Sequence, residues 1–159
     1  MANEGKTFEK IIAQSLKDGN GYLYRLNDNM SGYISIGNPC DFFYYCANVL
    51  YCIECKTVEM ARFPFSNIQD MQMDGLLKAN AKKGVWGGFL IYYRSTKSTQ
   101  LVNVDTVRRL YSEGKRSLSI TDTGVLIKST PLQLYSRYTV KDMEDALKAA
   151  YRMKYKGEV

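Results

Sequence analysis

The fold is decided by DFFYYCANVLYCIECKT, the stretch from Asp41 to Thr57. It is rich in aromatic and β-branched residues and is interrupted only at Ala47-Asn48. This pattern predicts two antiparallel strands joined by a two-residue turn. Because few of its positions are polar, the hairpin is expected to be buried on both faces. The chain should therefore be built around a β-sheet.

Strand pairing in this hairpin brings two acids together. If Ala47-Asn48 forms the turn, Asp41 lies directly opposite Glu54. Opposed residues have Cβ atoms about 5 Å apart, and like charges at that distance are destabilising unless they are neutralised. A divalent cation would neutralise them, and Mg²⁺ prefers oxygen ligands. Lys56 is two residues beyond Glu54, so it projects from the same face.

A plainer interpretation of the same residues stays open. Glu54 and Lys56 are also expected to pair on a solvated strand face, with Asp41 only ending a turn after Pro39. The Ala-Asn turn is not the Asn-Gly pair that favours a type I′ hairpin. A register slip of one residue would separate the two acids.

Two further polar residues lie on expected helices. A helix over Ile68 to Lys82 places Gln72 on its apolar stripe, where a buried amide needs partners. The partner is either the backbone or a water or phosphate at the acidic site. A first helix, Phe8 to Leu16, carries Glu9 beside its apolar face. For Glu9 a first-turn carboxylate favoured by the helix dipole is the plain alternative.

The remaining pattern predicts a mixed α/β or α+β domain with helices covering a central sheet. Asn27 to Pro39 is rich in turn residues, and the region Gly84 to Gly88 is expected to end the second helix. No repeat interrupts the chain, so residues 1–159 are expected to form a single domain. The other expected elements are strands at Tyr22–Leu26, Phe89–Tyr93, Leu101–Val104 and Val125–Ile127, and helices at Thr106–Glu113 and Lys141–Tyr155.

Composition excludes several kinds of chemistry. The 159 residues include no histidine, which rules out histidine-based triads, Cys-His pairs and HExxH zinc sites. The segment MANEGKTFEKII does not resemble a signal peptide, and no apolar run is long enough to span a membrane, so a cytoplasmic protein without membrane contact is expected. The four cysteines are expected to be buried free thiols rather than a zinc site, since Cys52 and Cys55 point to opposite faces of a strand.

Charge and aromatic content point weakly to nucleic acid. The net charge of +6 favours a phosphate-rich partner. The 13 tyrosines suggest an interface or a base-stacking surface, although most tyrosines pack with their hydroxyl groups in water. Six basic residues are candidates for gripping a DNA backbone, with simple solvation as the alternative for each: Lys6, Arg62, Lys82, Lys83, Arg94 and Lys97.

The order of these motifs resembles a known nuclease superfamily. The motifs are Gly5-x-x-x-Glu9 on a first helix, Asp41, Glu54-Cys55-Lys56, Phe63-Pro64 before a helix with Gln72, and a glycine-rich strand from Gly87 to Ile91. Together they resemble the PD-(D/E)xK nucleases, and within them the RecU-type Holliday junction resolvases of Gram-positive bacteria and their phages. The resemblance covers about Gly5 to Tyr138. It implies a restriction-endonuclease-like mixed sheet flanked by helices.

The resemblance also implies roles for individual residues. Asp41 and Glu54 would bind Mg²⁺, or Mn²⁺ in its place, assisted by the backbone carbonyl of Cys55 and by Glu9. Lys56 would position or deprotonate the attacking water, and Gln72 would complete the catalytic site. The family hydrolyses DNA phosphodiester bonds, leaving 5′-phosphates, and works as a homodimer that resolves four-way junctions during recombination and repair.

One departure from the family pattern concerns substrate choice. RecU proteins carry a longer stalk segment before the catalytic Asp, where this chain has only Asn27 to Cys40. A junction-resolving, metal-dependent endonuclease is therefore the leading hypothesis. The alternatives are a DNA-binding module of the same fold without catalysis, and a nuclease of the superfamily with another branched or site-specific substrate.

Overall fold

The structure is a computed structural model, and it describes residues 3–27, 38–122, 124–127 and 138–157. Most of the turn-rich connection expected between Asn27 and Pro39 lies outside these residues. None of the helices described is long and apolar enough to cross a membrane.

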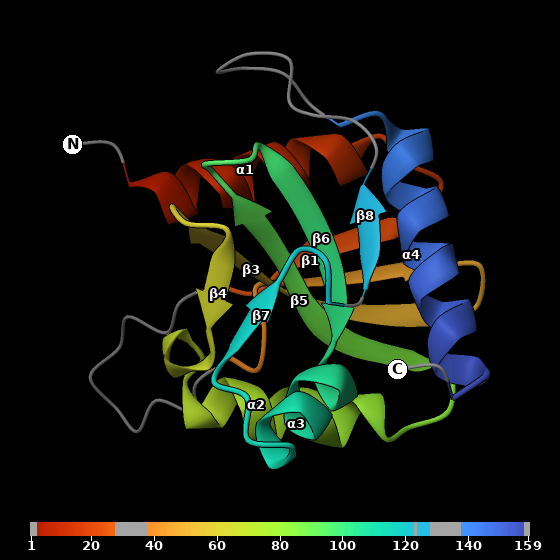
Figure 1. The fold of residues 1–159 in the computed structure, drawn as a ribbon. Helices are drawn as coiled ribbons and strands as arrows, with labels where there is room; N and C mark the ends of the chain where they lie inside the picture. The colour runs from red at the N-terminus through yellow and green to blue at the C-terminus, as the bar shows by residue number, and fades with distance from the viewer. Residues whose placement is uncertain (1–2, 28–37, 123, 128–137, 158–159) are drawn as a thin grey trace, which may run out of the picture.

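A six-stranded mixed sheet forms the centre of the molecule, in the order β1-β2-β3-β5-β6-β8 (Figure 1). Strands β3 and β5 pair in parallel and the other neighbours are antiparallel. Strands β4 and β7 form a separate two-stranded sheet that packs against this one through Phe63 and Leu118. The strands are β1 (Tyr22–Arg25), β2 (Phe42–Cys46), β3 (Val49–Val58), β4 (Arg62–Pro64), β5 (Val85–Tyr93), β6 (Ser98–Asn103), β7 (Ser117–Ser119) and β8 (Val125–Ile127).

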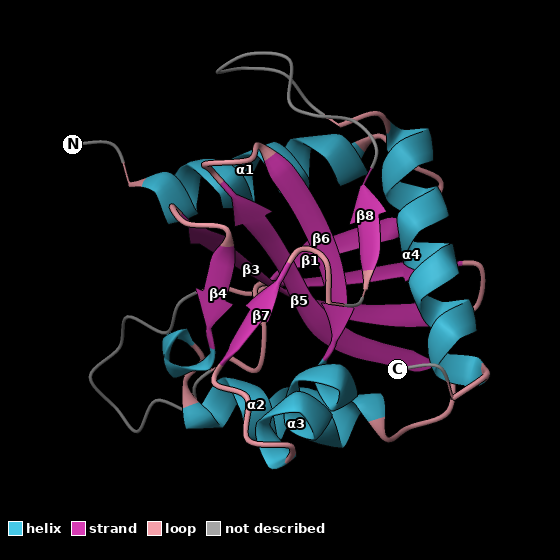
Figure 2. Cartoon of the chain, in the orientation of Figure 1, coloured by secondary structure: helices cyan, strands magenta, loops and turns pink. Residues whose placement is uncertain are grey.

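Helices cover both faces of the sheet, as Figure 2 shows, which confirms the predicted fold class. One core lies between the sheet and α1 (Glu4–Lys17) and α4 (Val140–Tyr155), around Ile12, Phe42 and Leu147. The other lies on the opposite face, against α2 (Asp70–Asn80) and α3 (Val104–Ser112), around Leu76, Phe89 and Val107. A single turn of 3-10 helix, η1 (Phe65–Asn67), leads into α2.

The central hairpin has the predicted register. Ala47 and Asn48 form its turn with φ angles of 51° and 64°, the left-handed values that a type I′ turn requires. Tyr44 pairs with Tyr51 and Phe42 with Ile53. Asp41 immediately precedes β2, and its backbone N–H donates to the carbonyl of Ile53 at 3.0 Å. Asp41 therefore stands opposite Glu54.

The expectation that the hairpin is buried on both faces is wrong for one face of β2. Tyr45 is exposed and Phe43 is only half-buried. Both lie on the face of the sheet that α2 occupies, but α2 packs on β5 and β3. The neighbouring half of that face, formed by β1 and β2, is left more open.

The expected break at Gly84 to Gly88 is also wrong in part, because β5 begins at Val85. A Cβ atom on Gly87 would stand 2.9 Å from the carbonyl oxygen of Leu76, and one on Gly88 would stand 2.2 Å from that of Val102. These two glycines therefore do not end a helix. They let α2 and β6 approach a central strand closely.

Several element boundaries differ from those expected. The first helix begins at Glu4, four residues earlier, because Asn3 caps it by accepting from the N–H of Lys6. Val104 begins α3 rather than ending β6, because the Asn103 side chain caps that helix. The four cysteines are buried free thiols, as predicted, and Cys52 and Cys55 belong to different cores.

Candidate active site

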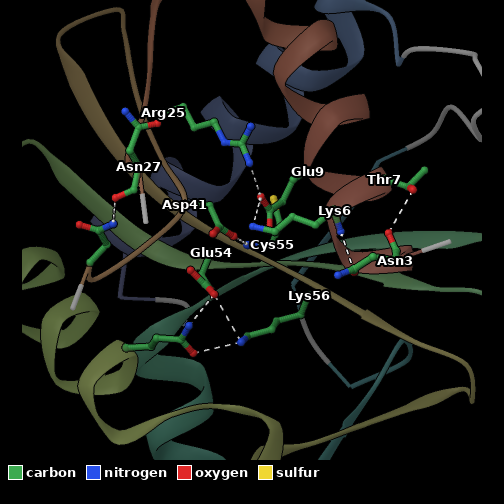
Figure 3. Close-up of polar contacts among 12 residues, drawn as sticks. Asn3, Lys6, Thr7, Glu9, Arg25, Asn27, Asp41, Glu54, Cys55 and Lys56 are labelled. Atoms are coloured by element: carbon green, nitrogen blue, oxygen red, sulfur yellow. Dashed lines mark hydrogen bonds and ion pairs between the residues drawn. The ribbon is translucent and has the colours of Figure 1, made fainter. Parts of the chain in front are cut away.

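Asp41 and Glu54 meet where β2 begins beside the second half of β3 (Figure 3). The carboxylate of Asp41 accepts a hydrogen bond from the backbone N–H of Cys55 at 2.8 Å. In a strand the N–H and C=O groups of one residue point to the same side, so the carbonyl of Cys55 is directed toward Asp41 as well. The carboxylates of Asp41 and Glu54 and the carbonyl of Cys55 thus converge at the start of β2.

Lys56 and Gln72 complete a polar cluster with Glu54. The Nε2 of Gln72 donates to Glu54 Oε1 at 2.7 Å, and its Oε1 accepts from Lys56 Nζ at 3.0 Å. Lys56 Nζ also lies 3.3 Å from Glu54 Oε1. Glu54 is only 5% exposed. The amide therefore joins a buried carboxylate to an ammonium and holds both in place.

Burial changes the proton affinity of both acids. It is the main cause that raises the pKa of Glu54 to about 8, with the charge of Asp41 adding to the rise and Lys56 opposing it. Burial also raises the pKa of Asp41 to about 6, against the hydrogen bond from Cys55, and the charge of Glu9 raises it further. Two carboxylates held this way attract either protons or a cation.

Glu9 reaches the same region from α1, on the other side of Asp41. Its Oε2 lies 3.0 Å from Arg25 Nη2 and 3.8 Å from Lys6 Nζ. Figure 3 shows Glu9 close to Asp41, with the side chain of Arg25, at the end of the edge strand β1, reaching to Glu9. Glu9 thus points inward, as one of its two interpretations held, but it is neutralised by two basic residues.

The donor set suits a hard divalent cation. Carboxylate and carbonyl oxygens are the ligands that Mg²⁺ and Mn²⁺ take, usually one or two carboxylates together with water and phosphate oxygens. Within the described ranges, three or more Cys, Asp or Glu side chains do not cluster as a metal cage would require. The site therefore fits a cation held by Asp41, Glu54 and the Cys55 carbonyl, and open to a substrate phosphate.

Local structure fixes α2 so that Gln72 reaches β3. At its start, the backbone N–H of Gln69 donates to Gln72 Oε1 at 3.2 Å. In its middle, Gly75 lies against Pro39, where a Cβ would stand 2.6 Å from the proline ring. At its end, the buried side chain of Asn80 accepts from the N–H of Gly87 at 3.0 Å. The helix is thus tied to the sheet through Asn80 at its end and through Gln72, which contacts Glu54 and Lys56 of β3.

The network around Asn80 was not anticipated from the sequence. Its Nδ2 donates to Asn103 Oδ1 at 3.0 Å and to Asp105 Oδ2 at 2.9 Å. Asn80 shares the apolar stripe of α2 with Gln72 and Leu76, so a buried amide at that position was a usable signal. Arg25, which neutralises Glu9, carried no comparable signal because its strand is separated in sequence from α1.

The six basic candidates for DNA contact fall at different places. Lys6 lies beside Glu9. Arg94 and Lys97 follow β5, at the end of the sheet nearer to Lys56, which pairs with Ile91. The guanidinium of Arg94 donates to Thr57 Oγ1 at 2.8 Å and pairs with Glu59. Arg62 is exposed on β4. Lys82 and Lys83 precede β5, at the opposite end of the sheet.

The acidic cluster and the cavity beside α2 lie at different places among the described residues. This cavity of about 740 Å³ lies between η1, α2 and α3, lined by Ile68, Met73, Val107 and Tyr111 among others. None of Asp41, Glu54 and Lys56 lines it.

Comparison with known proteins agrees with the fold and with the family that the sequence resembles. No curated protein matches the chain significantly by sequence. Among solved structures, the chain is similar to Hjc of Archaeoglobus fulgidus, described as a Holliday junction resolvase from an archaeal hyperthermophile. The TM-score is 0.53 at 14% identity, over 87% of this chain and 97% of that one, so the likeness concerns the fold. The sequence profile of the RecU family, Recombination protein U, matches residues 24–141, which include Asp41, Glu54, Lys56 and Gln72. The chain therefore belongs to the RecU family.

Proposed function

We propose that this protein is a divalent-metal-dependent endonuclease that hydrolyses phosphodiester bonds in four-way DNA junctions. The observation that carries the proposal is the convergence of Asp41, Glu54, Lys56 and Gln72 on one face of the sheet. Membership of the RecU family supports recombination as the context. Mg²⁺ is the proposed cofactor, with Mn²⁺ as a substitute.

Asp41 and Glu54 hold the cation in this proposal, together with the carbonyl of Cys55. A bound divalent cation supplies a nucleophilic water near neutral pH and stabilises charge on the phosphate, which a site without histidine needs. The carboxylates that bind it must be ionised, and because burial raises the pKa of both, the cation would compete with protons for the site.

Lys56 and Gln72 act on the substrate side. The ammonium of Lys56 stands where negative charge develops on the phosphate, and it positions the attacking water. Gln72 fixes the positions of the Lys56 and Glu54 side chains through its two hydrogen bonds. Glu9 tunes Asp41 from the side of α1, or joins the metal when Arg25 moves away.

A panel of DNA substrates tests the activity. Four-way junction, flap and linear duplex are incubated with Mg²⁺, with Mn²⁺ and with EDTA, and cleavage products are resolved on denaturing gels. The proposal predicts symmetric cuts in the junction that leave 5′-phosphates and need a metal. Cleavage of the flap or duplex in preference to the junction would identify a nuclease with another substrate.

The main rival is a DNA-binding module that keeps the fold without the chemistry. Lys56→Ala separates the two functions: cleavage disappears and junction binding remains if the protein is an enzyme. If the wild type binds the junction and leaves it whole with either metal, the rival stands. A homodimer is also proposed, since symmetric cutting needs two sites, and sedimentation of the free protein tests it.

A further inference from the structure

We infer that four aromatic side chains beside the candidate active site form a stacking platform for unpaired DNA bases. The inference rests on the proposed function, because it assigns the surface that receives DNA at that site. The four residues, called the aromatic strip, are Tyr22 and Tyr24 of β1 and Phe43 and Tyr45 of β2.

Strand register places the aromatic strip on one face. Tyr22 pairs with Tyr45, and Tyr24 pairs with Phe43. Directly paired residues of antiparallel strands share a face, and residues two apart along a strand share it too. All four rings therefore project from the same side of the sheet, about 5 Å apart between strands and about 7 Å apart along each strand.

The aromatic strip is unusually open for a cluster of this kind. Tyr22, Tyr24 and Tyr45 are 67%, 51% and 49% exposed. Their partners on the other face, such as Tyr44, are buried under α1 and α4. The tyrosines are thus not needed for the core, and their rings are available to a ligand.

The aromatic strip is continuous with the candidate active site. Residues 41, 43 and 45 alternate onto one face, so Asp41 begins the row that Phe43 and Tyr45 continue. The backbone N–H of Leu26, two residues beyond Tyr24, donates to the carbonyl of Asp41 at 2.9 Å. A DNA strand whose phosphate lies at Asp41 and Glu54 therefore has its neighbouring nucleotides over the aromatic strip.

Charge at the ends of the aromatic strip suits a nucleic acid. Strands β1 and β2, YLYR and FFYYC, contain no acidic residue. Beyond Tyr45, its partner Leu50 donates from its N–H to the carbonyl of Gly84 at 2.9 Å, which brings the exposed Lys82 and Lys83 to that end. Aromatic rings on a sheet surface beside basic residues hold single strands by stacking, two or three bases at a time.

The aromatic strip assigns a role in DNA binding to Lys82 and Lys83, whereas the acidic cluster assigns them none. They lie at the opposite end of the sheet from Lys56, too far to assist at the scissile phosphate. At the end of the aromatic strip they are placed to hold the backbone of the nucleotides stacked there. The proposed ligand is therefore the unpaired or splayed part of a branched DNA, not its duplex arms.

Binding measurements test the platform separately from catalysis. Each tyrosine of the aromatic strip is changed to Ala and to Phe in a Lys56→Ala background, and binding to labelled single-stranded oligonucleotide, four-way junction and linear duplex is followed by fluorescence anisotropy. Tyr155→Ala is the matched control, since Tyr155 is 79% exposed on α4. Thermal unfolding checks that each variant is folded.

The platform predicts that each Ala variant binds single strands about 5- to 150-fold more weakly, the range expected for one stacked base, and that each Phe variant binds as the parent does. Duplex binding should change less than twofold. Unchanged single-strand binding in the Ala variants overturns the inference. So does a loss of binding that accompanies a shift from dimer to monomer in sedimentation, because the aromatic strip is then an interface between two copies. If the wild type cuts no DNA but the Ala variants still lose single-strand binding, the platform stands and the proposed activity fails.

Discussion

Asp41 and Glu54 face each other at the buried end of the β2–β3 hairpin, and the charge of Asp41 helps to raise the pKa of Glu54 to about 8. Burial is the main cause of the raised pKa values of both acids, so keeping both ionised in the folded protein has an electrostatic cost. Keeping two acids there is reasonable if a cation binds between them. The pair thus links the stability of the fold to the occupancy of the site.

The pH dependence of stability follows from these shifts. The folded-state pKa values of about 8 for Glu54 and about 6 for Asp41 lie above the ordinary values of 4.5 and 3.8. The folded protein therefore binds protons more tightly than the unfolded chain, so their favourable contribution is complete below about pH 4 and is lost as pH rises to about 8.

Glu54→Gln should accordingly stabilise the metal-free protein at pH 8, by on the order of 2 kcal/mol, and should change it little at pH 4. A glutamine at this position still accepts from Gln72 and carries no charge to desolvate. Urea unfolding in EDTA at the two pH values measures the difference. If Glu54→Gln lost the same stability at pH 4 and at pH 8, the ionised Glu54 would not be destabilising the folded protein at pH 8.

Metal binding should offset the free-energy cost of keeping the two buried carboxylates ionised. At pH 8, Mn²⁺ or Mg²⁺ at a hundred times its dissociation constant should raise the free energy of unfolding by about 2.7 kcal/mol. Asp41→Asn and Glu54→Gln should remove this stabilisation, whereas Glu59→Gln should not, because Glu59 is exposed and pairs with Arg94 outside the cluster. Thermal unfolding with and without metal makes the comparison. A similar gain in all four proteins would place the metal elsewhere.

Gln72→Ala should lower kcat about 10- to 100-fold and leave KM for DNA nearly unchanged, because hydrogen bonds to charged groups contribute about 1.5 to 3 kcal/mol. The variant removes the bridge between Glu54 and Lys56, and with it the acceptor for the Gln69 N–H at the start of α2. Met71→Ala, half-exposed on the same helix, is the control. Single-turnover cleavage gives both constants. A rise in KM alone would make Gln72 a DNA contact and not a positioning residue.

Asn80→Ala should destabilise the fold by about 3 kcal/mol, since it leaves the N–H of Gly87 and the side chain of Asn103 without their buried partner. Lys78→Ala, exposed on the same helix, should stay within about 0.5 kcal/mol of the wild type. Urea denaturation at neutral pH distinguishes the two. A small effect of Asn80→Ala would show that α2 is held mainly by its apolar contacts.

Much of the site was predictable because it depends on local geometry. A two-residue turn fixes the register of a hairpin, so the positions of Asp41, Glu54 and Lys56 follow from counting along one short stretch. Helical periodicity placed Gln72 on the buried face of α2 in the same way. Gln72 could be identified without knowing that α2 packs near β3. That packing was needed only to show that its amide contacts Glu54 and Lys56.

The parts that escaped prediction depend on contacts between segments distant in sequence. By local composition Gly87 and Gly88 indicate a helix stop, although the family resemblance places them in a strand, and the closeness of α2 and β6 explains why glycine is needed there. The pairing of Glu9 with Arg25 requires knowing that β1 lies beside α1. The exposure of Tyr45 depends on where α2 ends its coverage of the sheet, which no periodicity within β2 reveals.

Cleavage of a four-way junction by the wild type, Glu54→Gln and Lys56→Ala, each with Mg²⁺ and with EDTA, tests the central claim most directly. The account predicts that the wild type cuts only with the metal, while both variants bind the junction and leave it intact. A wild type that never cuts, or a Glu54→Gln variant that cuts at the wild-type rate, would contradict it.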